Sequence, residues 1–204
     1  ARRQTPSRQY AERPAMRATG PGQPAHLLLD VVERLTHLGI PYAIVGAFAV
    51  SFHGIPRSTN DADAAIWLKG TGTAEEHLKV HFDRTGFRTE LRPGDFDDPI
   101  SGAFIVEDVH GNRVDLVLGV RGMDPEAAGR CVAATLMDAS GKIIAAEDLI
   151  AMKIFAGGIQ DLEDVRGILQ VSGKQLDLNL LKNLARRYGV EVVRTLDAIL
   201  SEMA

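Results

Sequence analysis

The pattern of apolar and polar positions along the chain changes character near residue 145. Up to that point, short apolar runs typical of buried strands alternate with segments whose apolar positions recur every three or four residues, as in helices. After it, the apolar spacing is helical throughout. The pattern predicts an α+β protein in which a mixed β-sheet flanked by helices is followed by a C-terminal helical bundle.

The expected elements follow one another along the whole chain after a polar start. Helices are predicted over residues 26–38, 47–53, 73–84, 146–155, 161–170, 176–188 and 190–203. Strands are predicted over residues 42–45, 61–68, 87–91, 104–108 and 113–118, with weaker candidates at 131–137 and 142–144. The fourth and fifth strands are expected to form a hairpin around Gly111. Thr73 is expected to cap the helix that follows it.

Composition divides the chain into three parts. Residues 1–25 are rich in proline and arginine and poor in large aliphatic side chains, so we expect an unordered or non-native tail in which Met16 is a candidate natural start. Residues 26–145 form the expected α+β core, and residues 146–204 form the expected helical region.

Charge and cysteine content narrow the possible partners and the compartment. The net charge of −4 excludes a whole-surface attraction for nucleic acid, so a nucleotide or RNA must be bound by a local patch or through metal ions. The single cysteine, Cys131, excludes an internal disulfide and fits a reducing compartment, which predicts a cytoplasmic location. No apolar run reaches the ~20 residues of a membrane helix, and no signal-peptide pattern is expected.

Three aspartates carry the candidate chemistry. Asp61 and Asp63 lie in one predicted strand, where alternate side chains share a face at a spacing of roughly 7 Å. Asp115 lies in another apolar strand. Two unit charges ~5 Å apart repel by roughly 3 kcal/mol at an effective dielectric constant of ~20. A divalent cation reverses the sign of that energy, and magnesium prefers oxygen ligands. The trio therefore predicts a metal site.

A second candidate feature is the turn at Gly46, where an apolar strand meets the start of a short helix. Glycine allows a ligand to approach the backbone closely. The first turn of a helix offers unpaired N–H groups and the positive end of the helix dipole. We expect this turn to be a seat for phosphate.

The order of these motifs resembles that of the nucleotidyltransferase superfamily. In that superfamily a glycine turn, here Gly46-Ala47, is followed by an Asp-x-Asp pair between apolar residues and then by an aspartate on a later strand. More narrowly, residues 45–63 resemble the AbiEii/MenT-like toxins and related minimal nucleotidyltransferases. Residues 147–153 and 161–165 resemble the C-terminal helical motif of those proteins.

The chain departs from the pattern of these proteins at two positions. Ala47 stands where a glycine or serine is typical, so the backbone N–H is kept and a hydroxyl is lost. Gly158 lies where a basic residue is typical. The resemblance covers about residues 26–170. Within it the chain keeps all the acidic residues of the family pattern and has fewer groups that could contact phosphate.

The resemblance implies a magnesium-dependent enzyme that transfers a nucleoside monophosphate from an NTP to an acceptor hydroxyl. Two magnesium ions would be held by Asp61, Asp63 and Asp115, and Asp115 would also lie near the acceptor hydroxyl. Lys153 would complete the catalytic set. The implied nucleotide-binding residues are Gly46, Ala47, Arg57, Thr59, Asp161 and Asp164, of which the last two would orient Lys153 or a ribose.

Each of these residues also has a simpler structural interpretation. The Asp-x-Asp pair could end a strand in solvent, and Asp115 could be an ion-pair partner of Arg113 or Arg57. Lys153 could extend its ammonium from an apolar helix to solvent. Asp161 and the acidic residues after it could cap a helix.

Three functions follow from these alternatives. The first is a transferase that modifies RNA, including tRNA, or a protein, as the toxin of a toxin–antitoxin system with an antitoxin partner. The second is a transferase that acts on a small molecule, as aminoglycoside-modifying relatives do. The third is a non-catalytic protein that binds a nucleotide or a partner.

Overall fold

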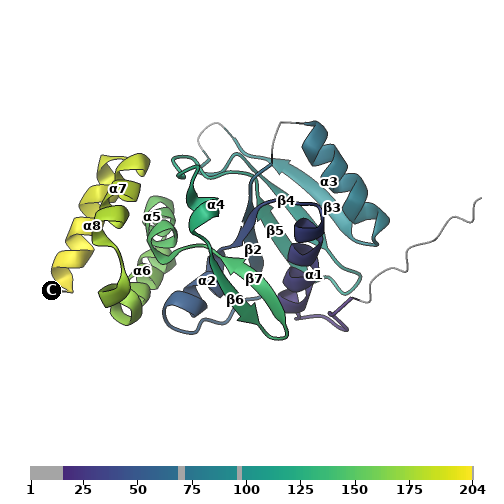
Figure 1. Ribbon diagram of the computed structural model, residues 1–204, viewed down its shortest axis with the longest axis horizontal. Helices are drawn as coiled ribbons and strands as arrows, with labels where there is room; N and C mark the ends of the chain where they lie inside the picture. Colours follow the sequence, from purple (N-terminus) through teal and green to yellow (C-terminus); the bar gives the residue numbers. More distant parts are fainter. Residues whose placement is uncertain (1–15, 69–71, 96–97, 204) are drawn as a thin grey trace, which may run out of the picture.

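The computed structural model describes residues 16–68, 72–95 and 98–203. It contains one β-sheet that is flanked by helices, and a group of helices gathers at one end of the molecule (Figure 1). The strands are β1 (Tyr42–Ile44), β2 (Ala62–Ile66), β3 (Arg88–Pro93), β4 (Gly102–Glu107), β5 (Arg113–Val117), β6 (Val132–Leu136) and β7 (Ala139–Ile143). The helices are α1 (Pro24–His37), α2 (Gly46–His53), α3 (Thr73–Arg84), α4 (Ala127–Arg130), α5 (Ala146–Ala156), α6 (Ile159–Ser172), α7 (Leu178–Tyr188) and α8 (Val190–Glu202).

The sheet has seven strands in the order β3-β4-β5-β2-β1-β7-β6. The pairs β2–β5 and β1–β7 are parallel, and the remaining pairs are antiparallel. The predicted mixed sheet, its flanking helices and the C-terminal helical bundle are therefore confirmed. Helix α1 packs against β2, β5 and β7, and α2 lies between β2 and the C-terminal helices α5 and α6.

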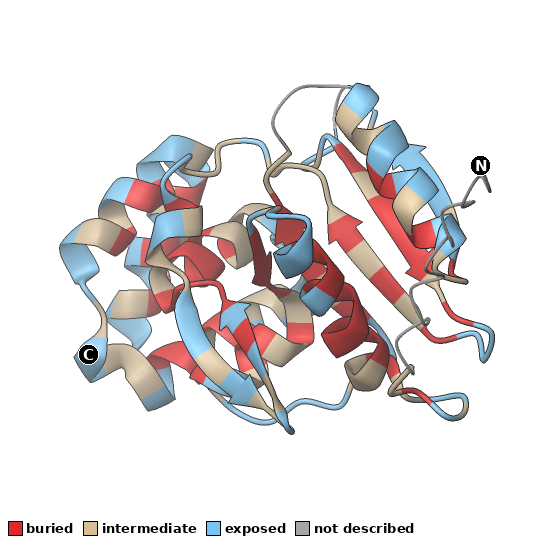
Figure 2. Cartoon of the chain, turned by 45° about the vertical axis from the view of Figure 1, so that its right-hand side comes forward, coloured by how far each residue is buried: buried red, intermediate tan, exposed pale blue. Residues whose placement is uncertain are grey.

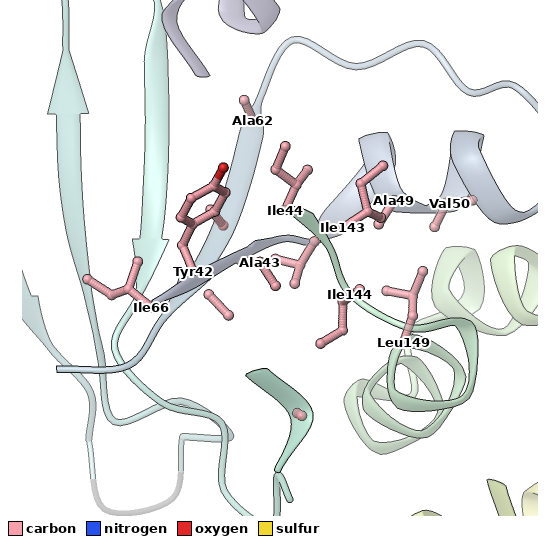
Figure 3. Close-up of a cluster of buried hydrophobic side chains, with 14 of the residues drawn as sticks. Tyr42, Ala43, Ile44, Ala49, Val50, Ala62, Ile66, Ile143, Ile144 and Leu149 are labelled. Carbon is pink, nitrogen blue, oxygen red and sulfur yellow. The ribbon is translucent and has the colours of Figure 1, made fainter. Parts of the chain in front are cut away.

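The hydrophobic core holds the short strand β1 from both sides. Ile44 pairs with β2 on one side and with Ile143 of β7 on the other, and all three residues of β1 are buried. Figure 3 shows Ile44 and Ile143 on the side of Ala49 of α2, and Ile144 beside Leu149. Figure 2 shows the buried positions running along α1 and across the central strands. The turn that follows β1 is thus anchored to a rigid part of the protein.

The segment of residues 16–23 differs from the prediction of an unordered tail. Arg17 Nη1 lies 2.7 Å from Asp30 Oδ1 and 2.8 Å from Glu33 Oε2, and the backbone N–H of Gln23 donates to Asn112 Oδ1 at 2.7 Å. Composition could not reveal these contacts because the partners lie in α1 and in the β4–β5 turn. The tail prediction for residues 1–15 lies outside the described residues.

One local prediction is wrong, the two weak strand candidates are confirmed as strands, and one short helix was not predicted. Thr73 is the first residue of α3, the cap position belongs to Gly72, and no side chain caps that helix end. The weak strand candidates near residues 131–144 form an antiparallel hairpin, β6–β7, whose turn places Met137 at φ 54°. The short helix α4 was not predicted from the apolar pattern, because a single turn has no periodicity to detect.

No helix in the described ranges is long and apolar enough to cross a membrane.

Candidate active site

The strand order brings two of the three aspartates side by side. Strands β2 and β5 are parallel neighbours, and Asp63 is directly opposite Asp115 in their register. Neighbouring strands lie ~4.8 Å apart, so the two side chains share one face at close range. Asp61 lies just before β2 and is exposed at the edge of the same region. The sheet thus concentrates negative charge at one place.

Gly46 lies against the Asp63 carboxylate because β1 is the other neighbour of β2. The N–H of Val45 donates to the carbonyl oxygen of Asp63 at 3.0 Å, and Gly46 begins α2 with φ 61°. A Cβ atom at this position would collide with the Asp63 carboxylate. Both the backbone conformation and the space therefore require glycine here. The start of α2, whose first N–H groups have no partner within the helix, lines the same cavity as the aspartates.

A cavity of about 370 Å³ lies where these elements meet. Nine of the ten residues that the sequence singled out line it: Gly46, Ala47, Arg57, Thr59, Asp61, Asp63, Asp115, Lys153 and Asp161. The tenth residue, Asp164, is buried and contacts the lining residues Arg57 and Lys153. Two further lining residues, Arg113 and Gln160, were not predicted as site residues. Arg113 could have been found from its spacing, because residues i and i+2 of a strand point to the same face.

Asp164 joins two cations of the cavity wall. Its Oδ2 atom lies 2.7 Å from Arg57 Nη1 and 2.8 Å from Lys153 Nζ, and the carboxylate is only 4% exposed. Lys153 also lies 2.6 Å from Asp161 Oδ1. Lys153 is therefore held by two carboxylates of α6 and does not simply extend to solvent. Gln160 Nε2 donates to Asp164 Oδ1 at 3.3 Å.

Arg113 and Asp115 form a two-pronged ion pair on β5. Arg113 Nε lies 2.6 Å from Asp115 Oδ1, and Arg113 Nη2 lies 2.7 Å from Asp115 Oδ2. The hydrogen bonds to Asp115 raise the pKa of Arg113. Of the two partners considered for Asp115, Arg113 is the one present, whereas Arg57 pairs with Asp164.

Thr59 shapes the approach to Asp61. Its hydroxyl donates to the Asp61 carbonyl oxygen at 2.8 Å and accepts from the Asp61 N–H at 3.1 Å. Such a local side-chain turn orders the loop before β2. Thr59 therefore has a structural role in this loop. Its contact with a nucleotide stays a prediction.

Asp63 has the most perturbed carboxylate of the cavity. Burial, followed by the nearby negative charges of Asp115 and Asp61, raises the pKa of Asp63 to about 6. Lys153 and Arg113 act in the opposite direction and do not cancel the increase. A carboxyl group that is costly to ionise beside two other carboxylates marks a place where a cation is favoured.

The three aspartates fit a hard divalent cation by chemistry, since all their donors are oxygen atoms. In this structure the three side chains are not gathered around one point. Across residues 16–68, 72–95 and 98–203, no group of three or more His, Cys, Asp or Glu side chains is close enough to hold a metal ion. Both oxygen atoms of Asp115 are taken by Arg113. The oxygen donors therefore suit magnesium by type, while the Asp115 donors are engaged by Arg113 in this structure.

Comparison with known proteins gives a fold but no sequence family. No protein-family model and no curated protein matches the chain. The solution structure of the antibiotic-resistance factor ANT(2'')-Ia matches with a TM-score of 0.55 and 14% identity, over 87% of this chain and 94% of that chain. The crystal structure of ANT(2'')-Ia with adenylyl-2''-tobramycin gives a TM-score of 0.52 at 14% identity, over 87% and 97%.

A third solved structure comes from Paracoccidioides brasiliensis. This antigenic nucleotidyltransferase-like protein matches with a TM-score of 0.51 and 17% identity, over 86% of this chain and 87% of that chain. At such low identities the likeness establishes the fold alone. The chain therefore has a nucleotidyltransferase-like α+β fold.

Proposed function

We propose that this protein is a magnesium-dependent nucleotidyltransferase. It would transfer a nucleoside monophosphate from an NTP to an acceptor hydroxyl and release pyrophosphate. The observation that carries this proposal is a single cavity in which Asp61, Asp63 and Asp115 face the start of α2 and Lys153. The fold that supplies this cavity is shared with nucleotidyltransferases.

The cavity walls supply the groups that a triphosphate requires. The first turn of α2, at Gly46 and Ala47, offers backbone N–H groups and the positive end of a dipole. Arg57 and Lys153 line the same cavity and bring positive charge to it. Because Asp164 and Asp161 hold these cations by ion pairs, their positions are set before a ligand arrives.

Magnesium bound by the three aspartates would neutralise the triphosphate and stabilise the attacking and leaving oxygen atoms of an in-line displacement. The chain itself has little covalent chemistry to perform beyond positioning and charge stabilisation. Asp115, on the outer of the two parallel strands, would lie near the acceptor hydroxyl and favour its deprotonation. Lys153 would hold phosphate oxygens in place.

An apolar recess beside the main cavity suits the base of the nucleotide. It has a volume of about 160 Å³ and shares Gly46, Asp63, Lys153 and Asp161 with the main cavity. Its remaining wall is apolar and includes Val117 and Met152. A flat base in this recess would place its phosphates beside the aspartates.

Two classes of acceptor are supported by different observations. The motif resemblance to AbiEii/MenT-like proteins favours RNA, including tRNA, or a protein, with a role as a toxin that an antitoxin partner restrains. The fold likeness to ANT(2'')-Ia, an antibiotic-resistance factor whose crystal structure contains adenylyl-2''-tobramycin, favours a small hydroxylated molecule. We place the macromolecular acceptor first, because its support comes from residues of the site.

The test incubates the protein and magnesium with each of the four labelled NTPs. Separate reactions contain total tRNA, cell-extract protein or a set of aminoglycosides. We expect label in the tRNA or protein fraction. Asp61→Ala and Asp63→Ala should each reduce transfer by roughly a thousandfold, because each would remove a metal ligand. Asp197→Asn serves as the control, since Asp197 is 54% exposed on α8 and remote from the cavity.

The outcomes separate the candidate functions. Label on aminoglycosides alone would favour the small-molecule transferase. Transfer that survives the substitutions at Asp61 and Asp63 would contradict the proposed site. Absence of Mg-NTP binding in calorimetry would contradict both enzymatic functions and leave a protein that binds another partner.

A further inference from the structure

The ion pair between Arg113 and Asp115 occupies the position where a metal ligand is expected. Two parallel contacts of 2.6 and 2.7 Å engage both oxygen atoms of Asp115. Both residues line the cavity, and their side chains are 37% and 28% exposed. The guanidinium therefore competes for the same oxygen atoms that magnesium would use.

Arg113 is also the cation that balances the carboxylate edge of the cavity. Its guanidinium contacts both oxygen atoms of Asp115, and Asp61 and Asp63 line the same cavity. The other two cations described in the cavity wall are held elsewhere. Arg57 and Lys153 both contact Asp164, which is 4% exposed. Arg113 is thus the cation that contacts the proposed metal ligand Asp115, and both residues belong to β5.

We propose that Arg113 is an exchangeable counter-ion that holds Asp115 until metal and nucleotide arrive together. The proposal rests on the nucleotidyltransferase function proposed above. A metal ion that binds alone must displace the guanidinium from Asp115 and leave it without a partner. When a triphosphate is present, its oxygen atoms are new partners for the guanidinium, and Asp115 is released to the metal at a smaller cost.

This exchange predicts positive coupling between metal and nucleotide. Each ligand should raise the affinity for the other by the same factor, because binding coupling is reciprocal. Arg113 would be the residue that links them, so its removal should weaken the coupling. It would act as a positioning residue that keeps the metal site incomplete until the triphosphate is bound.

The test compares wild type with Arg113→Gln, using Mn²⁺ as a paramagnetic probe that can be counted by electron paramagnetic resonance. The matched control is Arg92→Gln. Arg92 Nε lies 2.7 Å from Glu90 Oε1, so it forms an i, i+2 ion pair on β3, and it does not line the cavity. Affinity for Mn²⁺ is measured without nucleotide and with a non-hydrolysable NTP analogue.

We expect Arg113→Gln to tighten Mn²⁺ binding about tenfold in the absence of nucleotide. With the analogue bound, we expect no gain in affinity, so the coupling factor should shrink by about tenfold. Arg92→Gln should behave as wild type. Circular dichroism and thermal melting should show that both variants are folded.

Two results would overturn the proposal in distinguishable ways. If Mn²⁺ binds wild type and Arg113→Gln equally well without nucleotide, or if the substitution tightens both states equally, the role of Arg113 is wrong and the metal site stands. If Mn²⁺ binds neither protein in either state, the metal site and the proposed function fail together with it.

Discussion

Two ion-pair clusters at the cavity use the same residue types in different ways. On one wall, Asp164 joins Lys153 of α5 to Arg57 of the loop before β2, and the carboxylate is 4% exposed. On the other wall, Arg113 and Asp115 are two residues apart on one strand and are 37% and 28% exposed. The first cluster connects three segments of the fold, whereas the second connects a strand only to itself.

This difference in burial indicates which ion pairs hold the cavity in shape and which ion pair can exchange its partners. Loss of one partner from a buried cluster leaves an uncompensated charge, which costs several kcal/mol. An exposed pair contributes little to stability, because water and salt can replace either partner. The Asp164 cluster is therefore suited to fix the cavity wall, and the Arg113–Asp115 pair is suited to exchange partners during binding.

The largest expected effect comes from breaking the buried cluster. Asp164→Ala should lower the free energy of unfolding by about 3–5 kcal/mol, since Arg57 and Lys153 lose their shared carboxylate. Asp161→Ala is the comparison, because Asp161 is 28% exposed and its ion pair among the described residues is with Lys153. Its cost should be about 1 kcal/mol. Urea denaturation measures both, and equal costs would mean that Asp164 is not the centre of the wall.

The next effect concerns the turn at Gly46, between β1 and α2. Gly46→Ala should cost about 3 kcal/mol, because the residue has φ 61° and a Cβ would collide with Asp63. Gly111→Ala is the control, since Gly111 has φ 78° and a Cβ there would meet nothing within 4 Å. It should cost only the backbone strain, about 1 kcal/mol.

A double-mutant cycle sharpens the prediction for Gly46. Asp63→Ala removes the carboxyl group that the new Cβ would strike, so it should recover part of the cost of Gly46→Ala. Additive costs in the double variant would show that the collision is not the cause.

The third effect is a pH dependence that belongs to the carboxylate wall. The pKa of Asp63 is raised from 3.8 to about 6 in the folded protein, so the native state binds a proton more tightly than the unfolded chain does. Stability contributed by protonated Asp63 is present below pH ~4 and is lost as the pH rises to ~6. The loss should be about 2 kcal/mol, after allowance for solvent screening.

Asp63→Asn isolates this contribution from other titrating groups. The variant should be about 2 kcal/mol more stable than wild type at pH 7, and its advantage should vanish near pH 4. Urea denaturation at several pH values measures the difference. A difference that stays constant across this range would contradict the raised pKa.

The smallest effect is expected at the exchangeable pair. Arg113→Ala should change the free energy of unfolding by less than about 1 kcal/mol, because both partners are accessible to water. Chemical denaturation in low salt provides the measurement. A cost close to that of Asp164→Ala would remove the contrast between the two walls.

Much of the fold could be predicted because its signals are local. The helical period and the strand alternation located α3 at its observed bounds, and they placed α2, β2 and β5 within a few residues. Glycine at position 46 was identified from the strand–helix junction alone. The hairpin β6–β7 was missed as a hairpin because no residue of β6 is buried, so that strand shows no clear apolar alternation. Its place beside β1 depends on a parallel contact with a distant part of the chain.

The chain by itself determined the chemistry of the site. The aspartates and the glycine turn were found from residue type and spacing, because alternation in a strand is a local property. Lys153 was named from the family resemblance of its segment. The tertiary structure decided the pairing of charges. In the folded protein Arg57 forms an ion pair with Asp164, and Arg113 forms one with Asp115. The parallel pairing of β2 with β5 places Asp63 opposite Asp115. Such pairings depend on distances of a few ångströms between distant segments, and only the packed backbone sets those distances.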